Sequence, residues 1–127
     1  MARFLWICLG GAIGTAARYL ISLGSLRALG AGFPYGTLIV NVIGSFLIGL
    51  IMTASLHGAA ISQTLRMALT TGFLGGLTTY SSFNYETLAL CQKGLWPLGL
   101  LNFAVTTAGC ALAGLAGVLS GRWIAGG

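Results

Sequence analysis

The stretch that decides the fold runs from Thr70 to Asn84 and reads TTGFLGGLTTYSSFN. It lies inside a long apolar segment and crowds three glycines among hydroxyl residues. A membrane-spanning helix satisfies its own backbone hydrogen bonds, so this composition predicts a helix that opens at mid-membrane, where carbonyls and amides can serve an ion. Unpaired backbone groups are costly in hydrocarbon, and the break is therefore expected to face protein, water or a bound ion.

The rest of the chain has the composition of a membrane protein. Its 127 residues are 57% hydrophobic and 6% charged, with a mean hydropathy of +0.95. Apolar segments long enough to cross a hydrocarbon core of roughly 30 Å lie near residues 3–23, 35–56, 64–91 and 95–122. We therefore predict an all-α membrane protein in which residues 1–127 form a single domain of four transmembrane helices, the third of them broken.

Several other classes of protein are disfavoured by the same residues. The net charge is +5, but the basic residues are scattered, so no nucleic-acid surface is expected. The three cysteines are not spaced as metal ligands or as a redox pair. A cleavable signal peptide is the weaker alternative for the first segment, because the apolar run continues through Ile21. The single acidic residue has no nearby histidine, so no acid–base pair forms and we expect no enzyme.

The distribution of basic residues bears on how the chain inserts. In a four-helix arrangement three of them fall on each side: Arg3, Arg66 and Arg122 against Arg27, Lys93 and Arg18. Because the Lys/Arg bias of short loops sets orientation, a balanced count predicts insertion in both orientations. The simplest closed assembly is then an antiparallel dual-topology homodimer with its two-fold axis in the membrane plane. The alternative is a single orientation set by Arg3 and the first helix.

Polar residues on the second and fourth helices are candidates for an ion path. Asn41 recurs every four residues with Thr37 and Ser45, and its two N–H donors make it a candidate anion ligand. Ser45 is interpreted as a packing residue. Thr106 shares a column with Asn102, which either lines a permeation path or bonds neighbouring helices.

The third segment adds an aromatic pair and a lone carboxylate. Tyr80 and Phe83 are three residues apart and share a helix face, where ring edges with partial positive charge could line an anion path. A generic core pair is the alternative. Glu86 lies in apolar surroundings and is a functional candidate, for proton transfer, for pairing with Arg18 or for a hydrated vestibule; an interfacial position is the alternative. Arg18 itself either points inward or reaches the interface.

Three ordered blocks of this sequence resemble the Fluc (CrcB-type) family of fluoride channels. They are GGAIG at residues 10–14 followed by RY at 18–19, GTLIVNVIGSF at 36–46, and GFLGGLTTYSSF at 72–83. Each block alone is weak, since glycine-rich membrane helices are common. Together, in this order and over nearly the full chain, they are a specific match.

The resemblance implies a passive fluoride-selective channel that releases fluoride from the cytoplasm of a bacterial cell, with two pores per antiparallel homodimer. Residues 1–127 would then form one channel domain, surrounded by the lipids of the inner membrane. It also implies a structural sodium ion on the dimer axis, held by backbone carbonyls at the positions of Gly75 and Thr78. Asn41 and Phe83 match the pore-lining donor and aromatic of the family, and Ser81 and Ser82 fall with Glu86 in its polar pore region.

One position departs from the family pattern, and two rival functions remain. Tyr80 stands where the family usually has Phe, and the added phenol either slows fluoride exit or points away and changes little. A proton-coupled small multidrug exporter using Glu86 is the nearest alternative, because such exporters are also four-helix dual-topology dimers. A structural subunit that only assembles a larger complex is the other.

Overall fold

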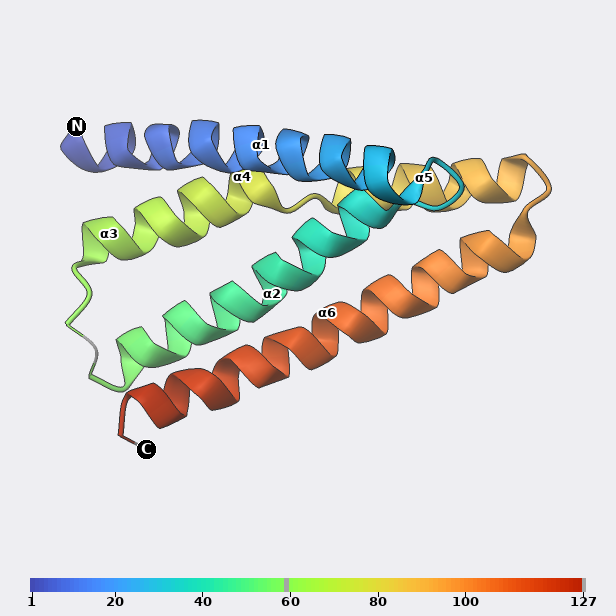
Figure 1. Ribbon diagram of the computed structural model, residues 1–127. Helices are drawn as coiled ribbons and strands as arrows, with labels where there is room; N and C mark the ends of the chain where they lie inside the picture. The colour runs from blue at the N-terminus through green and yellow to red at the C-terminus, as the bar shows by residue number, and fades with distance from the viewer. Residues whose placement is uncertain (59, 127) are drawn as a thin grey trace.

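The computed structural model describes residues 1–58 and 60–126, and this part of the chain is helical without any strand. The elements are α1 (Ala2–Leu29), α2 (Tyr35–Leu56), α3 (Gln63–Met67), the π-helix η1 (Ala68–Leu74), α4 (Gly75–Leu77), α5 (Tyr80–Gln92) and α6 (Trp96–Ile124). Three of them, α1, α2 and α6, are long and apolar enough to cross a membrane. The third predicted segment is divided into two pieces, α3–η1–α4 and α5, joined by an extended stretch (Figure 1). The all-helical prediction is confirmed.

The helical interruption is narrower than the sequence predicts. The composition of this stretch predicts that residues 72–79 do not continue as a regular helix. Helical structure continues through Leu77, with a widened π-helical turn over Ala68–Leu74. Only Thr78 and Thr79 have extended backbones. The prediction is wrong for residues 75–77, which are α-helical, because the glycines there permit close helix packing and do not unwind the helix.

A seam of glycines joins α1 to η1 and α4. Gly10 and Gly14 of α1 face Gly72 and Gly76 of the third segment, and a Cβ at any of the four would overlap the backbone of the facing helix. At Gly14 the overlapped groups are the Phe73 carbonyl and the Leu77 amide. The two backbones are therefore in direct contact, as in membrane helix pairs built on small residues.

Alanine at Gly14 is expected to destabilise the protein by about 1–3 kcal/mol, since neither backbone group that the new methyl meets can move aside. The midpoint temperature of unfolding in detergent measures this. Gly24→Ala is the matched control on the same helix, because a Cβ there meets nothing within 4 Å. The control should leave the midpoint unchanged or slightly higher, and equal losses in both variants would contradict the role of the seam.

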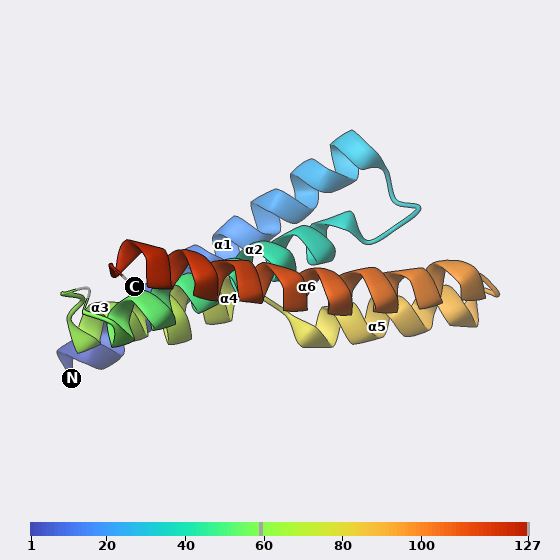
Figure 2. The same ribbon diagram turned by 90° about the horizontal axis from the view of Figure 1, so that it is seen from below.

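The α2 helix lies at the centre of the arrangement and packs along α6 (Figure 1). Gly49 and Gly117 allow this approach, since a Cβ at either would overlap the facing backbone. Seen from below, α5 lies beside the first half of α6 (Figure 2). In the described part of the chain, the buried hydrophobic residues are few: Val40, Ala54, Leu74, Leu77 and Phe83. Most large apolar side chains therefore point outward.

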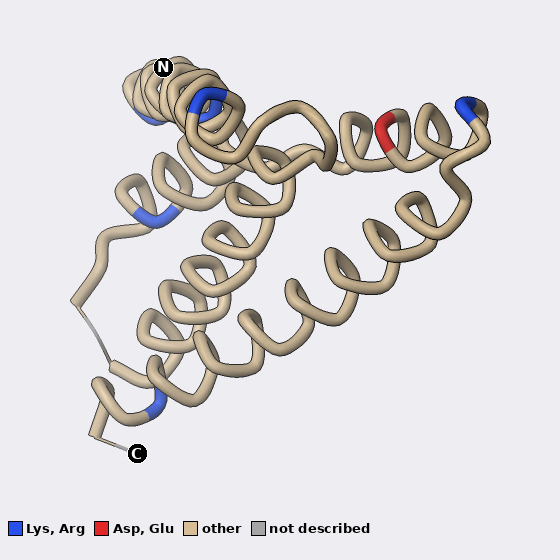
Figure 3. Tube along the Cα trace, turned by 45° about the vertical axis from the view of Figure 1, so that its right-hand side comes forward, with Lys and Arg blue, Asp and Glu red and all other residues tan. Residues whose placement is uncertain are grey.

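Both ends of the molecule carry basic residues, three at one end and two at the other. The N-terminus, α3 and the C-terminus lie at one end, and the loops after α1 and α5 lie at the other (Figure 1). Arg3, Arg66 and Arg122 belong to the first end, while Arg27 and Lys93 belong to the second. Figure 3 shows the basic residues spread over the molecule, with the one acidic residue on α5.

Candidate functional site

The extended residues Thr78 and Thr79 are held by the side chain of Asn41 on α2. The Asn41 Nδ2 donates to the Thr79 carbonyl at 3.0 Å, and the Thr79 amide donates to Asn41 Oδ1 at 2.8 Å. The side-chain amide of Asn41 therefore pairs with both the backbone N–H and the backbone carbonyl of Thr79, as a neighbouring strand would. The α2 helix can approach because residue 44 is glycine, where a Cβ would overlap the Thr78 methyl group.

Two helix ends of opposite polarity meet at the extended pair. The C-terminal end of α4 presents carbonyls, and the N-terminal end of α5 presents amides. Thr79 caps α5, because the Ser82 amide donates to Thr79 Oγ1 at 3.2 Å while the Thr79 hydroxyl donates to Ser82 Oγ at 3.0 Å. The partial negative charge of the first end favours a cation, and the partial positive charge of the second favours an anion.

The carbonyls of Gly75 and Thr78 both lose their helical partners. In a continuous helix they would accept from the amides of Thr79 and Ser82. Instead, the Thr79 amide donates to Asn41 Oδ1 and the Ser82 amide donates to Thr79 Oγ1. Oxygen is the ligand that hard cations prefer, so this pair of carbonyls fits a sodium ion. Among the residues described, no cluster of His, Cys, Asp and Glu offers a different metal site.

An open pocket of about 450 Å³ lies beside the extended pair, between α2, α5 and α6, and is called the break pocket here. Of the predicted anion-path residues it is lined by Asn41, Tyr80, Phe83 and Thr106, and Gly75 and Thr78 also reach it. Ser45, Thr107 and Cys110 also line it, and of these the sequence analysis did not single out Thr107. Ser45 was interpreted as a packing residue, although its spacing of four from Asn41 already placed both on one helix face.

Asn41 offers one free donor to this pocket and not two. One Nδ2 hydrogen is used on the Thr79 carbonyl, and an asparagine amide carries two. No other bond from this nitrogen is formed within the described residues. The prediction of two available donors is therefore wrong, because the same side chain also holds the extended backbone.

Three aromatic rings pack together here, and two of them, Tyr80 and Phe83, line the pocket. Tyr80 and Phe83 are in a T-shaped arrangement with centroids 5.7 Å apart, and Phe83 stacks on Phe103 of α6 at 6.2 Å. Phe83 is 5% exposed, whereas Tyr80 is 76% and Phe103 54% exposed. The expected pairing of Tyr80 with Phe83 is present, and Phe103 is a third ring that the sequence did not indicate. Two of the rings present most of their surface to whatever lies outside this chain.

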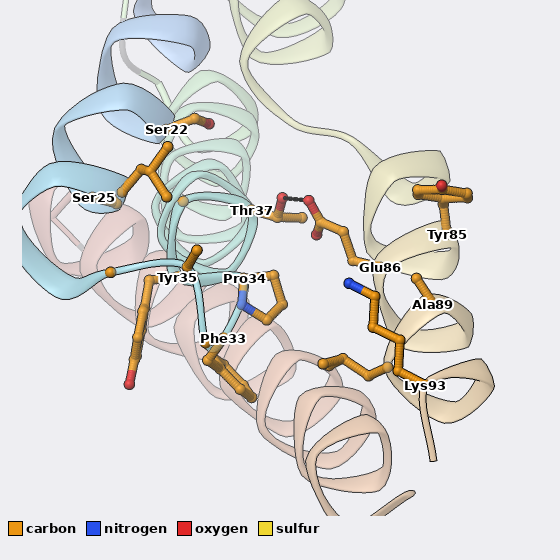
Figure 4. A pocket seen from close by; sticks show the side chains of 16 residues that line it. Ser22, Ser25, Phe33, Pro34, Tyr35, Thr37, Tyr85, Glu86, Ala89 and Lys93 are labelled. Atoms are coloured by element: carbon orange, nitrogen blue, oxygen red, sulfur yellow. Dashed lines mark hydrogen bonds between the residues drawn. The ribbon is translucent and has the colours of Figure 1, made fainter. Parts of the chain in front are cut away.

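Glu86 lies in a second pocket of about 420 Å³, the end pocket, formed by α1, α5, the loop after α1 and the start of α2. Its Oε1 accepts from the Thr37 hydroxyl at 2.9 Å, whereas its buried Oε2 has no hydrogen-bond partner among the residues that the structure describes. Lys93 lines the same pocket, and Figure 4 shows its side chain and the Glu86 carboxylate directed into it. Within the described residues, Glu86 forms no ion pair with Arg18 or Lys93, and its carboxylate accepts from the Thr37 hydroxyl.

The remaining predicted residues lie outside both pockets. Ser81 is exposed, and Ser82 is half-buried and engaged in the cap of α5. Arg18 is half-buried on α1, past its midpoint. Asn41, Tyr80, Phe83 and Thr106 therefore form one site, and Glu86 belongs to a separate polar site nearer the end of α5.

These features define a small helical membrane protein with an open, partly polar pocket beside a helix interruption. The chain matches the family described as CrcB-like protein, Camphor Resistance (CrcB), over residues 5–118. It is 54% identical over 99% of its length to the whole of the "Fluoride-specific ion channel FluC" of Anaeromyxobacter sp. (strain K). The proteins of the same name from Sorangium cellulosum and Geobacter sulfurreducens are 53% and 48% identical, covering 99% and 96% of this chain and 100% and 98% of their own.

The chain belongs to the CrcB-like family. The resemblance seen in the sequence is thereby confirmed, and the match identifies a transporter and not an enzyme. Its apolar helices and its bacterial relatives make it an integral protein of the bacterial inner membrane.

Proposed function

We propose that this protein is a passive, fluoride-selective channel that lets fluoride leave the cytoplasm through the break pocket. The observation that carries the proposal is the convergence of the Asn41 amide, the Thr106 hydroxyl, the Phe83 ring and the N-terminus of α5 on one pocket. The Asn41 amide and the N-terminus of α5 present partial positive charge to an anion, as would the edge of the Phe83 ring. The full-length relatives named fluoride-specific ion channels support the choice of fluoride.

The selectivity has a physical basis in the size of this path. Fluoride is small and strongly hydrated, so it crosses only where donors at short range replace its water. Once a partner subunit closes the open side of the pocket, a narrow route lined by aromatic edges and a few donors would exclude the larger chloride. Because nothing in the proposed path couples flux to a second ion, transport follows the fluoride gradient alone.

We propose that the working unit is an antiparallel homodimer with two pores, in which the helix interruption lies at mid-membrane. The exposed faces of Tyr80 and Phe103 then contact the partner subunit, which completes each pore. The presence of basic residues at both ends, without a strong excess at either, supports insertion in both orientations. The Gly75 and Thr78 carbonyls of both subunits would gather around one sodium ion on the two-fold axis.

Fluoride efflux from proteoliposomes, followed with a fluoride electrode, tests the proposed function. We expect rapid fluoride release without a proton gradient and retention of chloride from matched vesicles. Uptake of a lipophilic cation that requires both a proton gradient and Glu86 would instead establish the exporter. If the vesicles release neither fluoride nor the lipophilic cation, the protein would be assigned a structural role in a larger complex.

The ring of Tyr80, and not its hydroxyl, is expected to matter for conduction. The ring packs on Phe83, whereas the hydroxyl forms no hydrogen bond within the described residues. Tyr80→Phe should conduct fluoride within about twofold of the parent chain, and Tyr80→Leu should be slower by about tenfold, the order of one lost aromatic contact. Efflux rates per reconstituted channel decide this, and a large change in Tyr80→Phe would assign the hydroxyl a direct role.

A further inference from the structure

A buried chain of hydrogen bonds connects Thr106 at the wall of the break pocket to the backbone of Phe83. Thr106 Oγ1 donates to Asn102 Oδ1 at 3.2 Å, and Asn102 Nδ2 donates to Thr87 Oγ1 at 2.8 Å. Thr87 Oγ1 then donates to the Phe83 carbonyl at 2.7 Å. Asn102 is 1% exposed and Thr106 is 4% exposed, so water does not compete for these groups.

The direction of this chain determines what Thr106 offers to the pocket. A hydroxyl has a single hydrogen, and the one on Thr106 is donated to Asn102. Thr106 therefore presents only oxygen lone pairs to the pocket, and lone pairs repel an anion. In this state the residue cannot serve as the anion donor that the sequence suggests.

A rotation of the Asn102 side-chain amide can reverse the direction of these hydrogen bonds. Its oxygen and its nitrogen are similar in size, and turning the amide by half a rotation exchanges acceptor for donor. Thr87 then donates to Asn102 Oδ1, and Asn102 Nδ2 donates to Thr106 Oγ1. The Phe83 carbonyl keeps its helical partner, the backbone amide of Thr87. The hydrogen of Thr106 is thereby released toward the break pocket.

We infer that Asn102 is a positioning residue that switches Thr106 from an internal donor to an anion donor when fluoride enters the pocket. The inference rests on the proposed function. The number of hydrogen bonds along the chain stays constant, because the bond to the anion replaces the one from Thr87 to the Phe83 carbonyl. Only a side chain with both a donor and an acceptor at this place allows that exchange.

A double-mutant cycle on fluoride efflux tests the inference. Thr106→Val removes the hydroxyl donor. Asn102→Leu removes the amide that switches while keeping a similar side-chain volume. In Asn102→Leu we expect the Thr106 hydroxyl to donate to a backbone carbonyl of its own helix. Each variant is expected to lower the rate about tenfold, the order of one hydrogen bond to a charged group. The double variant should be no slower than Thr106→Val alone. If the rate reductions of the two single variants multiply in the double variant, the inference is overturned, and Asn102 only holds α5 against α6.

A second measurement observes the amide directly. The chain has three asparagines, so the ¹⁵N side-chain signal of Asn102 is identified by its loss in Asn102→Leu. We expect this signal to shift with added fluoride and not with chloride, and to stop shifting in Thr106→Val. An Asn102 signal that ignores fluoride would overturn the inference. Failure of the parent chain to conduct fluoride would overturn the proposed function instead.

Gly117→Ala is the control for a purely structural loss. It loosens α6 against α2, where its Cβ would overlap the Phe46 carbonyl, and it leaves the hydrogen-bonded chain untouched. This variant should be less stable in detergent, with a rate per folded channel close to that of the parent. Equal losses of rate in Gly117→Ala and Asn102→Leu would assign the effect of Asn102 to helix packing and overturn the inference.

Discussion

Asn41→Leu is expected to lower fluoride efflux by about a hundredfold, the largest effect of any single substitution considered. The change removes the only amide donor of α2 at the break pocket and leaves the amide and the carbonyl of Thr79 without partners. Each buried group left unpaired costs about 1–3 kcal/mol, and every 1.4 kcal/mol is about tenfold. Efflux from proteoliposomes, normalised to the amount of folded protein, gives the measurement.

Two further variants separate the donor from the support of the backbone. Asn41→Asp keeps an acceptor for the Thr79 amide but loses the donor and adds a negative charge, so it should also fail to conduct while remaining folded. Gln92→Leu makes a similar replacement at an exposed amide at the end of α5 and should conduct normally. Normal fluoride efflux through Asn41→Leu would remove Asn41 from the path.

Removal of sodium from both sides of the membrane is expected to abolish conduction. The carbonyls of Gly75 and Thr78 lack helical partners, and in the proposed dimer those of two subunits would repel one another without a cation between them. Vesicles prepared with a large organic cation in place of sodium should retain fluoride, and sodium added to both sides should restore release. Undiminished efflux without sodium would refute a structural role for the ion.

Thr78→Val provides a control for the sodium experiment. The hydroxyl of Thr78 donates to the Leu74 carbonyl, whereas the proposed ligand is its backbone carbonyl. This variant should therefore show the same half-maximal sodium concentration as the parent chain. A marked rise in that concentration would assign the hydroxyl to the ion site.

The sequence predicted the class of fold and part of the break pocket because both depend on local pattern. Apolar length gave the helices, and spacings of three and four residues placed Tyr80 with Phe83 and Asn41 with Ser45. Composition alone exaggerated the interruption, since glycine serves both to open a helix and to pack one. Gly72 and Gly76 serve the second purpose, and the extended backbone is left to Thr78 and Thr79.

Hydrogen-bond partners between distant segments could not be predicted. Asn41 and Thr79 are 38 residues apart, and Thr37 and Glu86 are 49 apart. Periodicity identifies which residues share a helix face but not which face of another helix they meet. This is why the donor count of Asn41 was overestimated and why Asn102 was not separated from Thr106 before the packing of α5 on α6 was known.

The glycine seam and the outward-facing apolar side chains together invert the usual map of mutational tolerance. In a water-soluble domain, truncating a large core residue is the damaging change. Here a saturation library would lose function mainly when the smallest residues are enlarged, while many leucines and valines could be exchanged freely. Substitutions during evolution would then be concentrated at its bulky residues, and its smallest residues would be the least tolerant of substitution.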